Sequence, residues 1–215
     1  MLELHSYWRS SASYRVRSAL NLKRLPYKIV PVHLARDGGE QHSADYRALN
    51  PQELVPTLRD GDFALSQSIP ILQYLEELHP EPALAPTELR ARMRHWSFCQ
   101  YIACELQPLQ NLRVLNYLTG TFGISEAQKI EWLRHWFSAG LAALEQSLPN
   151  TESLYCFGDT PTYADCCLVP HFFACDRFGV DVTPYPRLLA IVTRLRALPE
   201  FIAAHPNQQV DAPPA

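Results

Sequence analysis

The sequence predicts two domains, a mixed α/β domain over residues 1–82 and an all-helical domain over residues 88–215. Three observations predict this organisation: short alternating segments interleave with helical ones at the start, prolines crowd residues 80–87, and helical spacing dominates afterwards. The chain has 215 residues, 47% of them hydrophobic, which is enough to bury a core in each domain.

The first half of the α/β domain is predicted to run strand, helix, strand, helix. Residues 2–7 alternate as a strand, and residues 13–23 carry apolar side chains near helical spacing until Pro26 ends the helix. Residues 27–33 alternate again, and glycines at 38 and 39 break the chain before a short helix over residues 43–49.

A β-hairpin and a third helix are predicted to complete this domain. Residues 55–58 and 62–65 form two short strands around the Asp60-Gly61 turn, and a helix follows over residues 68–79. The order β-α-β-α-β-β-α fits a small mixed sheet with helices on its faces. It is similar to a thioredoxin-like domain, although the redox cysteine pair of thioredoxin is absent.

Beyond the prolines of residues 80–87, which exclude helix, the chain is predicted to be helical. The expected helices cover residues 88–118, 125–148, 162–178, 187–198 and 200–205. Thr162 and Asp165 have the spacing of a capping box that begins the third of them. Residues 211–215 are expected to be a frayed tail.

Composition and charge exclude several classes of function. Lys and Arg number 19 against 22 Asp and Glu, and the cations are scattered, so we expect neither nucleic acid nor a membrane as partner. The first residues lack the features of a leader and no stretch is long enough to span a bilayer, which favours a cytoplasmic protein. The six cysteines form no metal-ligating spacing with the eight histidines, so we expect reduced thiols and no metal.

The junction of strand and helix at Ser10-Ser11 is the most informative feature. Free N–H groups and the helix dipole attract an anion there, and a serine hydroxyl can stabilise a bound thiolate. Val55-Pro56 suggests a constrained, cis peptide bond that exposes the Val55 backbone to an extended peptide ligand, and Gln67-Ser68 begins a second helix able to hold a carboxylate. Taken singly, each feature is more often an ordinary N-cap or edge proline.

Together these features resemble the glutathione site of glutathione transferases. The stretch Ser10-Ser11-Ala12-Ser13-Tyr14-Arg15-Val16-Arg17-Ser18-Ala19-Leu20 is similar to the signature SSCxxRVRxAL of the zeta class, which holds maleylacetoacetate and maleylpyruvate isomerases. Further similar segments are residues 37–39, 48–51, 107–112, 158–159 and 181–186, so the resemblance covers nearly the whole chain. One departure is Ala12, where the class has cysteine, and it puts side activities of that thiol in doubt.

The resemblance implies both a reaction and the residues that perform it. The glutathione thiolate adds to the cis double bond of a maleyl keto acid, the bond rotates, and elimination returns the fumaryl isomer and glutathione, in aromatic amino acid or aromatic acid catabolism. The resemblance assigns thiolate stabilisation to Ser10 with Ser11. Its glutathione contacts are Gln41, Val55, Gln67, Ser68 and Gln107, and its contacts for substrate carboxylates are Arg9 and Arg177.

Several assignments have alternatives. Without the resemblance, Arg177 is a surface or salt-bridging arginine, and Arg113 is a third candidate that a solvated helix face explains equally well. Arg15 and Arg17 are expected to be structural, because at helical spacing they point away from the N-terminal opening. The resemblance also implies a homodimer in which the sheet domain of one subunit meets the helical domain of the other.

Two other functions compete with the isomerase. One is a glutathione transferase that conjugates or dehalogenates small electrophiles, against which the pair of carboxylate-matching arginines argues. The other is a non-catalytic binding module of the same fold, against which the retained Ser10, Gln67, Ser68 and Arg177 argue. Between maleylacetoacetate and maleylpyruvate the sequence decides little, although residues 107–111 look closer to the maleylacetoacetate enzymes.

Overall fold

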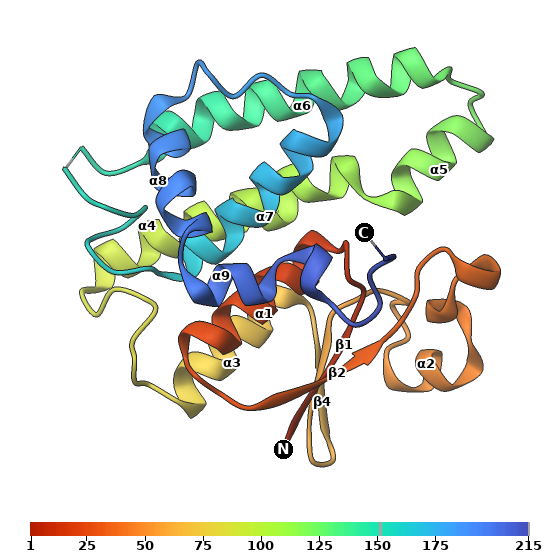
Figure 1. The fold of residues 1–215 in the computed structure, drawn as a ribbon, viewed down its shortest axis with the longest axis horizontal. Coiled ribbons are helices and arrows are strands. Elements are labelled where there is room, and N and C mark those ends of the chain that lie inside the picture. Colours follow the sequence, from red (N-terminus) through yellow and green to blue (C-terminus); the bar gives the residue numbers. More distant parts are fainter. Residues whose placement is uncertain (151, 215) are drawn as a thin grey trace. The chain divides into compact units, whose positions relative to one another are not determined.

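The computed structural model describes residues 1–150 and 152–214, which form two compact units (Figure 1). The first unit contains Met1–Leu84 together with the chain from Ala197 onward, and the second contains Ala85–Arg196. The chain leaves the first unit inside the proline-rich segment 80–87. The C-terminal end differs from the predicted domain ranges, because helix α9 (Pro199–Ala204) packs along the first helix of the chain.

The first unit is built on a four-stranded sheet of order β2-β1-β3-β4. Its first two strands are parallel, and the other neighbours are antiparallel. The strands are β1 (Leu2–Ser6), β2 (Tyr27–Pro31), β3 (Thr57–Asp60) and β4 (Phe63–Ser66). This is the mixed sheet that the order of elements predicts, so the thioredoxin-like arrangement is confirmed.

Helices cover the sheet of the first unit on both sides (Figure 1). They are α1 (Ser11–Leu22), α2 (Ala44–Leu49) and α3 (Ser68–Leu78), and α9 packs along α1. The first and third helices pack side by side, and α2 lies on the other side of the strands. Their shared core contains Leu4, Val16, Leu20, Leu58 and Leu72, all nearly inaccessible to solvent.

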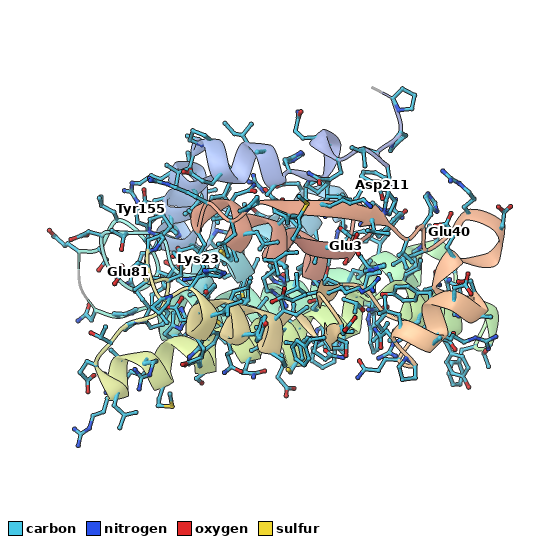
Figure 2. All side chains as sticks on the ribbon, turned by 90° about the horizontal axis from the view of Figure 1, so that it is seen from below. Glu3, Lys23, Glu40, Glu81, Tyr155 and Asp211 are labelled. Carbon is cyan, nitrogen blue, oxygen red and sulfur yellow. The ribbon has the colours of Figure 1, made fainter. Side chains whose placement is uncertain are left out.

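A buried lysine fastens the ends of two helices in this unit. Lys23, which Figure 2 labels, follows α1. Its side chain is fully buried. Its Nζ pairs with the Glu76 carboxylate at 2.7 Å and donates to the carbonyl oxygens of His79 and Pro82 at 2.6 and 3.0 Å. The end of α3 and the chain beyond it are thereby held to the end of α1.

The second unit is helical, as predicted. Its helices are α4 (Leu89–Gln100), α5 (Leu112–Gly120), α6 (Glu126–Ser147), α7 (Tyr163–Phe178) and α8 (Pro186–Arg196). Most of α7 is buried, and it packs against α4, α6 and α8. Its capping box is present: Asp165 Oδ2 accepts from the N–H and the hydroxyl of Thr162 at 2.7 and 2.8 Å.

The single helix predicted over residues 88–118 is interrupted. After α4 the chain forms a π-helical turn, Tyr101–Leu106, and a 3₁₀ segment, Gln107–Gln110, before α5 begins. Pro108 is the local cause, because proline supplies no N–H and its ring clashes with the preceding turn of an α-helix. Asn111 then caps α5 by accepting from the N–H of Arg113 at 3.1 Å.

Three findings concern membranes, thiols and metals. In the described ranges, no helix is long and apolar enough to cross a membrane. All six cysteines are free, and all but Cys104 are buried. Within residues 1–150 and 152–214, no group of three or more His, Cys, Asp or Glu side chains is placed to hold a metal ion.

Candidate functional site

Ser10 caps the first helix, as the strand–helix junction predicts. Its backbone is extended, its Oγ accepts from the N–H of Ser13 at 3.2 Å, and its own N–H donates to the Tyr7 carbonyl at 3.0 Å. A serine hydroxyl has one proton to donate besides its acceptor lone pairs. Because the cap uses only a lone pair, the proton of the half-buried Ser10 hydroxyl remains available to an anion.

The start of α1 is electrostatically suited to a negative charge. Ser11 is the first residue of this 12-residue helix, and no acidic side chain lies in the first turn. The unsatisfied N–H groups and the helix dipole are therefore not neutralised by the chain itself. Ala12, which replaces the cysteine of the zeta-class signature, is buried, so a methyl group stands at that position.

Arg17 supports the loop that carries Ser10. It is fully buried and donates from Nη1 to the Ser6 hydroxyl, from Nη2 to the Trp8 carbonyl, and from Nε to the Ala204 carbonyl, each at 3.0 Å. Burial lowers the pKa of Arg17 to about 10, opposed by Tyr27, Asp211 and Tyr14. Arg17 is thus structural, as expected, although its guanidinium lies under the N-terminal loop instead of pointing away from it.

Arg15 corrects the expectation that this residue points away from the opening. Its side chain is buried, and Nη1 donates to the hydroxyl oxygen of Ser68, the first residue of α3. In this bond the Ser68 hydroxyl oxygen is the acceptor, as the Ser10 oxygen is in its helix cap. The hydroxyl proton of Ser68 is therefore available for a hydrogen bond to a ligand. This hydrogen bond places the positive charge of Arg15 next to Ser68.

Gln67 precedes α3 in an unusual backbone conformation. Its φ is 71°, in the left-handed region, and its side chain does not cap the helix. Instead Nε2 donates to Oε1 of Gln52 at 2.5 Å. The first N–H groups of α3 therefore have no side-chain cap from Gln67, which leaves this helix N-terminus suited to a carboxylate.

The predicted cis bond at Val55-Pro56 is present. Val55 is half-buried. The carbonyl oxygen just before it, on Leu54, accepts from the Tyr46 hydroxyl at 2.6 Å and from Nδ2 of Asn50 at 2.8 Å. These two donors fix the backbone that leads into Val55.

The side chain of Gln41 is more buried than a contact with a ligand requires. Its side chain is buried under Gly39, where φ is 108° and a Cβ would lie 2.4 Å from the Gln41 amide nitrogen. Its Nε2 lies 3.0 Å from Nε2 of His42, and in the described part of the chain its Oε1 is buried without a hydrogen-bond partner. His42 in turn pairs with Glu53. Sequence reasoning missed this pair, and no spacing signal links residues 42 and 53.

The remaining predicted residues are arginines and a glutamine. Arg9 is half-buried beside Ser10, with its guanidinium 5.5 Å from the Trp8 ring centre. In the second unit, Arg177 is exposed near the end of α7, with its guanidinium 4.7 Å from the Phe178 ring centre. Gln107 is half-buried at the start of the 3₁₀ segment, and Arg113 is exposed on α5.

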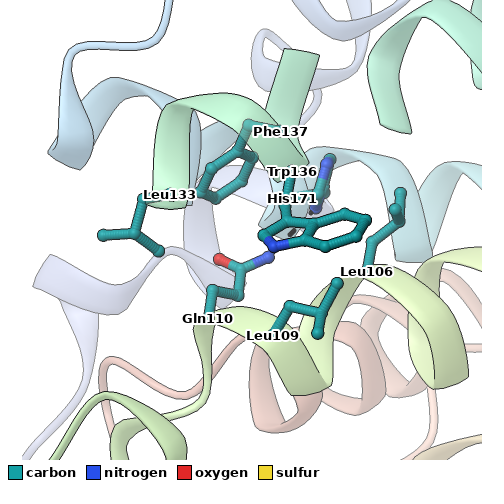
Figure 3. Close-up of a pocket in the computed structure, with 7 residues that line it drawn as sticks. All are labelled: Leu106, Leu109, Gln110, Leu133, Trp136, Phe137 and His171. Carbon is teal, nitrogen blue, oxygen red and sulfur yellow. Dashed lines mark hydrogen bonds between the residues drawn. The ribbon is translucent and has the colours of Figure 1, made fainter. Parts of the chain in front are cut away.

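A small apolar pocket in the second unit was not expected from the sequence (Figure 3). Its volume is about 10 Å³, about the space of one water molecule. Nε2 of Gln110 lies 3.3 Å from Nδ1 of His171, which is buried. The lining residues are Leu106, Leu109, Gln110, Leu133, Trp136, Phe137 and His171.

Both units match one family of enzymes. Residues 4–83 match the family model for the glutathione S-transferase N-terminal domain, and residues 131–194 match that for the C-terminal domain. A similar curated protein is a probable maleylacetoacetate isomerase of Vibrio cholerae, 46% identical over 98% of this chain and 98% of that protein.

Solved structures agree with this match. A maleylpyruvate isomerase, described as a bacterial glutathione S-transferase in the zeta class, has a TM-score of 0.94 and 42% identity over 98% of this chain and 100% of its own. A maleylacetoacetate isomerase of Methylobacterium extorquens AM1, solved with malonate and glutathione, has a TM-score of 0.92 and 40% identity over 99% and 100% of the two chains. With both domains matched and identities above 40% along its length, the chain belongs to the zeta class of the glutathione S-transferase family.

Proposed function

We propose that this protein is a glutathione-dependent cis-trans isomerase of a maleyl keto acid, maleylacetoacetate or maleylpyruvate. The observation that carries the proposal is the Ser10 hydroxyl, whose oxygen is occupied by the Ser13 N–H while its proton stays free at the start of α1. The named activities of the similar proteins support the same reaction.

The residues of the first unit fit glutathione. This ligand has a thiol, two carboxylates and an extended peptide backbone, and the unit offers a donor for each kind of group. We assign the thiol to Ser10 with Ser11, a carboxylate to Ser68 and the uncapped N-terminus after Gln67, and the peptide backbone to Val55. Among the described residues the amide oxygen of Gln41 has no partner, which suits the glutathione amino or amide groups once the Gln41 side chain turns.

When bound, glutathione supplies a thiolate that adds reversibly to the cis double bond and so lets that bond rotate. The chain itself must keep the thiol ionised and hold the keto acid still. Ser10 does the first by donating its hydroxyl proton to the sulfur, and the N-terminal dipole of α1 adds positive potential. A single donor aimed at developing charge contributes about 3 to 4 kcal/mol to lowering a barrier.

Arginines supply the recognition of the substrate in this proposal. Arg9 adjoins Ser10 in the chain, and we assign it one substrate carboxylate; Arg177 of the second unit takes the other, and Gln107 contacts glutathione. The malonate in the Methylobacterium extorquens enzyme is a dicarboxylate, which supports a site for two acidic groups in that protein. A planar guanidinium suits bidentate binding of such groups.

We further propose that the enzyme works in the cytoplasm as a homodimer. The free cysteines are in keeping with a reducing compartment. On the first unit the edge strand β4 leaves Phe63 49% exposed, and on the second unit α4 leaves Leu89 and Met93 60% and 50% exposed. Exposed apolar residues at a sheet edge and along one helix are typical of surfaces that a second copy covers.

Light scattering on a sizing column tests the dimer. Met93→Glu and Phe63→Glu should each shift the protein toward the mass of a monomer. Phe122→Glu is the matched control, because Phe122 is 68% exposed but lies after α5, outside the proposed surface. A monomeric parent protein, or a Phe122→Glu variant that dissociates equally, contradicts the assignment.

The reaction is tested by following maleylacetoacetate and maleylpyruvate by absorbance with and without glutathione, and by measuring free glutathione at the end. Turnover that requires glutathione but leaves its concentration unchanged, with a fumaryl product, establishes the isomerase and names its substrate. Stoichiometric loss of glutathione would instead identify a conjugating transferase. Absence of glutathione binding would leave a non-catalytic module.

A further inference from the structure

The C-terminal segment runs along α1 and is fastened to it by hydrogen bonds (Figure 1). The Tyr14 hydroxyl donates to the Phe201 carbonyl at 3.3 Å, and Nδ2 of Asn21 donates to the Glu200 carbonyl at 2.9 Å. Arg17 contributes its bond to Ala204, and the Phe201 side chain is buried. The segment is therefore a fixed part of the first unit up to at least Ala204.

The chain beyond α9 remains ordered as far as Asp211, contrary to the expectation of a frayed tail over residues 211–215. Nε2 of Gln209 donates to the carbonyls of Ala203 and His205 at 3.1 and 3.0 Å. The N–H of Ala212 donates to the Gln209 carbonyl at 3.0 Å, which closes a turn around Asp211 (Figure 2). Residue 215 lies outside the described residues.

Asp211 contacts the loop that carries Ser10. Its Oδ2 accepts from the N–H of Trp8 at 2.9 Å, although 203 positions separate the two residues. The carbonyl of Trp8 accepts from Nη2 of Arg17 at 3.0 Å. Both polar backbone groups of Trp8 are thus bound by charged side chains, which form stronger hydrogen bonds than neutral ones.

The loop is short, so its geometry follows from these contacts. Only Arg9 separates Trp8 from Ser10, and the N–H of Ser10 donates back to the Tyr7 carbonyl. A rotation of the Trp8 peptide therefore moves the Ser10 backbone and the direction of its hydroxyl. The second oxygen of Asp211 is buried and has no hydrogen-bond partner among the described residues, so the bond to the Trp8 N–H is the one hydrogen bond that this carboxylate makes there.

We propose that Asp211 is a positioning residue for Ser10, which it aims by holding the N–H of Trp8. The inference rests on the proposed function, because that function gives Ser10 its role toward the glutathione thiol. It predicts that the far end of the chain controls the ionisation of bound glutathione. A misplacement of about 1 Å can lower a rate on the order of 100-fold, so even a small movement of Ser10 is measurable.

The test is a titration of the bound glutathione thiolate by its ultraviolet absorbance, together with kcat/KM for the keto acid. Asp211→Ala should raise the midpoint of the thiolate titration by about one pH unit and lower kcat/KM at least about tenfold. Asp211→Asn keeps an oxygen for the Trp8 N–H and should stay within about threefold of the parent. Asp62→Ala, which removes an exposed carboxylate at the β3–β4 turn, is the matched control and should change neither quantity.

Asp211→Ala values that coincide with those of Asp62→Ala overturn the proposal. If Asp211→Ala does not fold, Asp211→Glu replaces it, since the extra methylene displaces the carboxylate and should move the same midpoint; an unchanged midpoint is again a refutation. The titration needs no keto acid. A parent protein that ionises glutathione but turns over neither acid therefore refutes the isomerase while the Asp211 result still stands.

Discussion

The guanidinium of Arg15 donates from Nη1 to the hydroxyl oxygen of Ser68, joining the first helix of the chain to the start of the third. The contact orients a serine proposed to bind a glutathione carboxylate. It also brings a buried positive charge to the N-terminus of α3, where the dipole is positive as well. Both would attract an anionic ligand bound there.

Replacing Arg15 should weaken the binding of glutathione. We expect Arg15→Met and Ser68→Ala each to raise the Kd about tenfold, and to leave kcat at saturating glutathione nearly unchanged. The double variant should lose less than the sum, with a coupling of about 1 kcal/mol or more, because both changes break one contact. Calorimetric Kd values for the four proteins check this, and strictly additive losses would contradict it.

Removing the Ser10 hydroxyl should affect chemistry far more than stability. Ser10→Ala is expected to lower kcat/KM by about 100-fold to 1,000-fold and to raise the pKa of bound glutathione. Its lost helix cap should cost about 1 kcal/mol. Ser43→Ala is the control: Ser43 caps α2 by accepting from the Tyr46 N–H at the same 3.2 Å. Kinetic measurements should show a large loss of kcat/KM for Ser10→Ala only, and unfolding measurements a similar loss of stability for both variants. Equal activities of the two variants would mean that Ser10 serves only as a helix cap.

The two arginines assigned to substrate should act on the keto acid alone. Arg9→Gln and Arg177→Gln are each expected to raise KM for the keto acid about 10-fold to 100-fold, with the Kd for glutathione unchanged. Arg177→Lys should recover only part of the loss, because an ammonium lacks the planar fork. Arg113→Gln, on an exposed part of α5, should stay within about twofold in the same assays. A loss confined to Arg113→Gln would move the carboxylate site there.

His95 should make the second unit sensitive to acid. It is buried, its Nε2 accepts from the N–H of Ala164 at 3.2 Å, and burial lowers its pKa from 6.5 to about 4. Between these values the unfolded state binds more protons than the folded state, so stability is full above pH 6.5 and falls as pH drops toward 4. Because each pKa unit corresponds to about 1.4 kcal/mol, the loss in free energy of unfolding by pH 4 amounts to about 3 kcal/mol.

The comparison variant is His95→Gln, which keeps an acceptor for the Ala164 N–H but does not titrate. Urea unfolding across that pH interval should show the parent losing more stability than the variant. Parallel curves for the two proteins would mean that His95 is protonated in the folded state without penalty.

Local patterns predicted the parts of the site that depend on local chemistry. Hydroxyl residues at a strand–helix junction predicted the cap at Ser10, a valine–proline pair predicted the cis bond, and turn residues predicted the hairpin before Ser68. The direction of Arg15 was wrong for a geometrical reason. Long side chains on a helix lean back toward its N-terminus, so spacing alone misplaces a guanidinium that is several bonds from the backbone.

Contacts between distant parts of the chain could not be predicted from local sequence patterns. Asp211 and Trp8, or His42 and Glu53, are paired by the fold, and neither hydrophobic period nor spacing connects them. The interruption at residues 101–110 had a local signal in Pro108, which was outweighed by apolar periodicity on both sides. Tertiary packing decided the two long-range pairings, and it acts after the local propensities.

The placement of the last helix has a consequence for biosynthesis. The ribosome delivers α9 and Asp211 after the whole of the second unit, so the surface of α1 that α9 covers stays bare while that unit is being made. Until α9 has been synthesised, part of the α1 surface in the first unit is therefore uncovered. The loop bearing Ser10 is therefore held by Asp211 only after the second unit has been made.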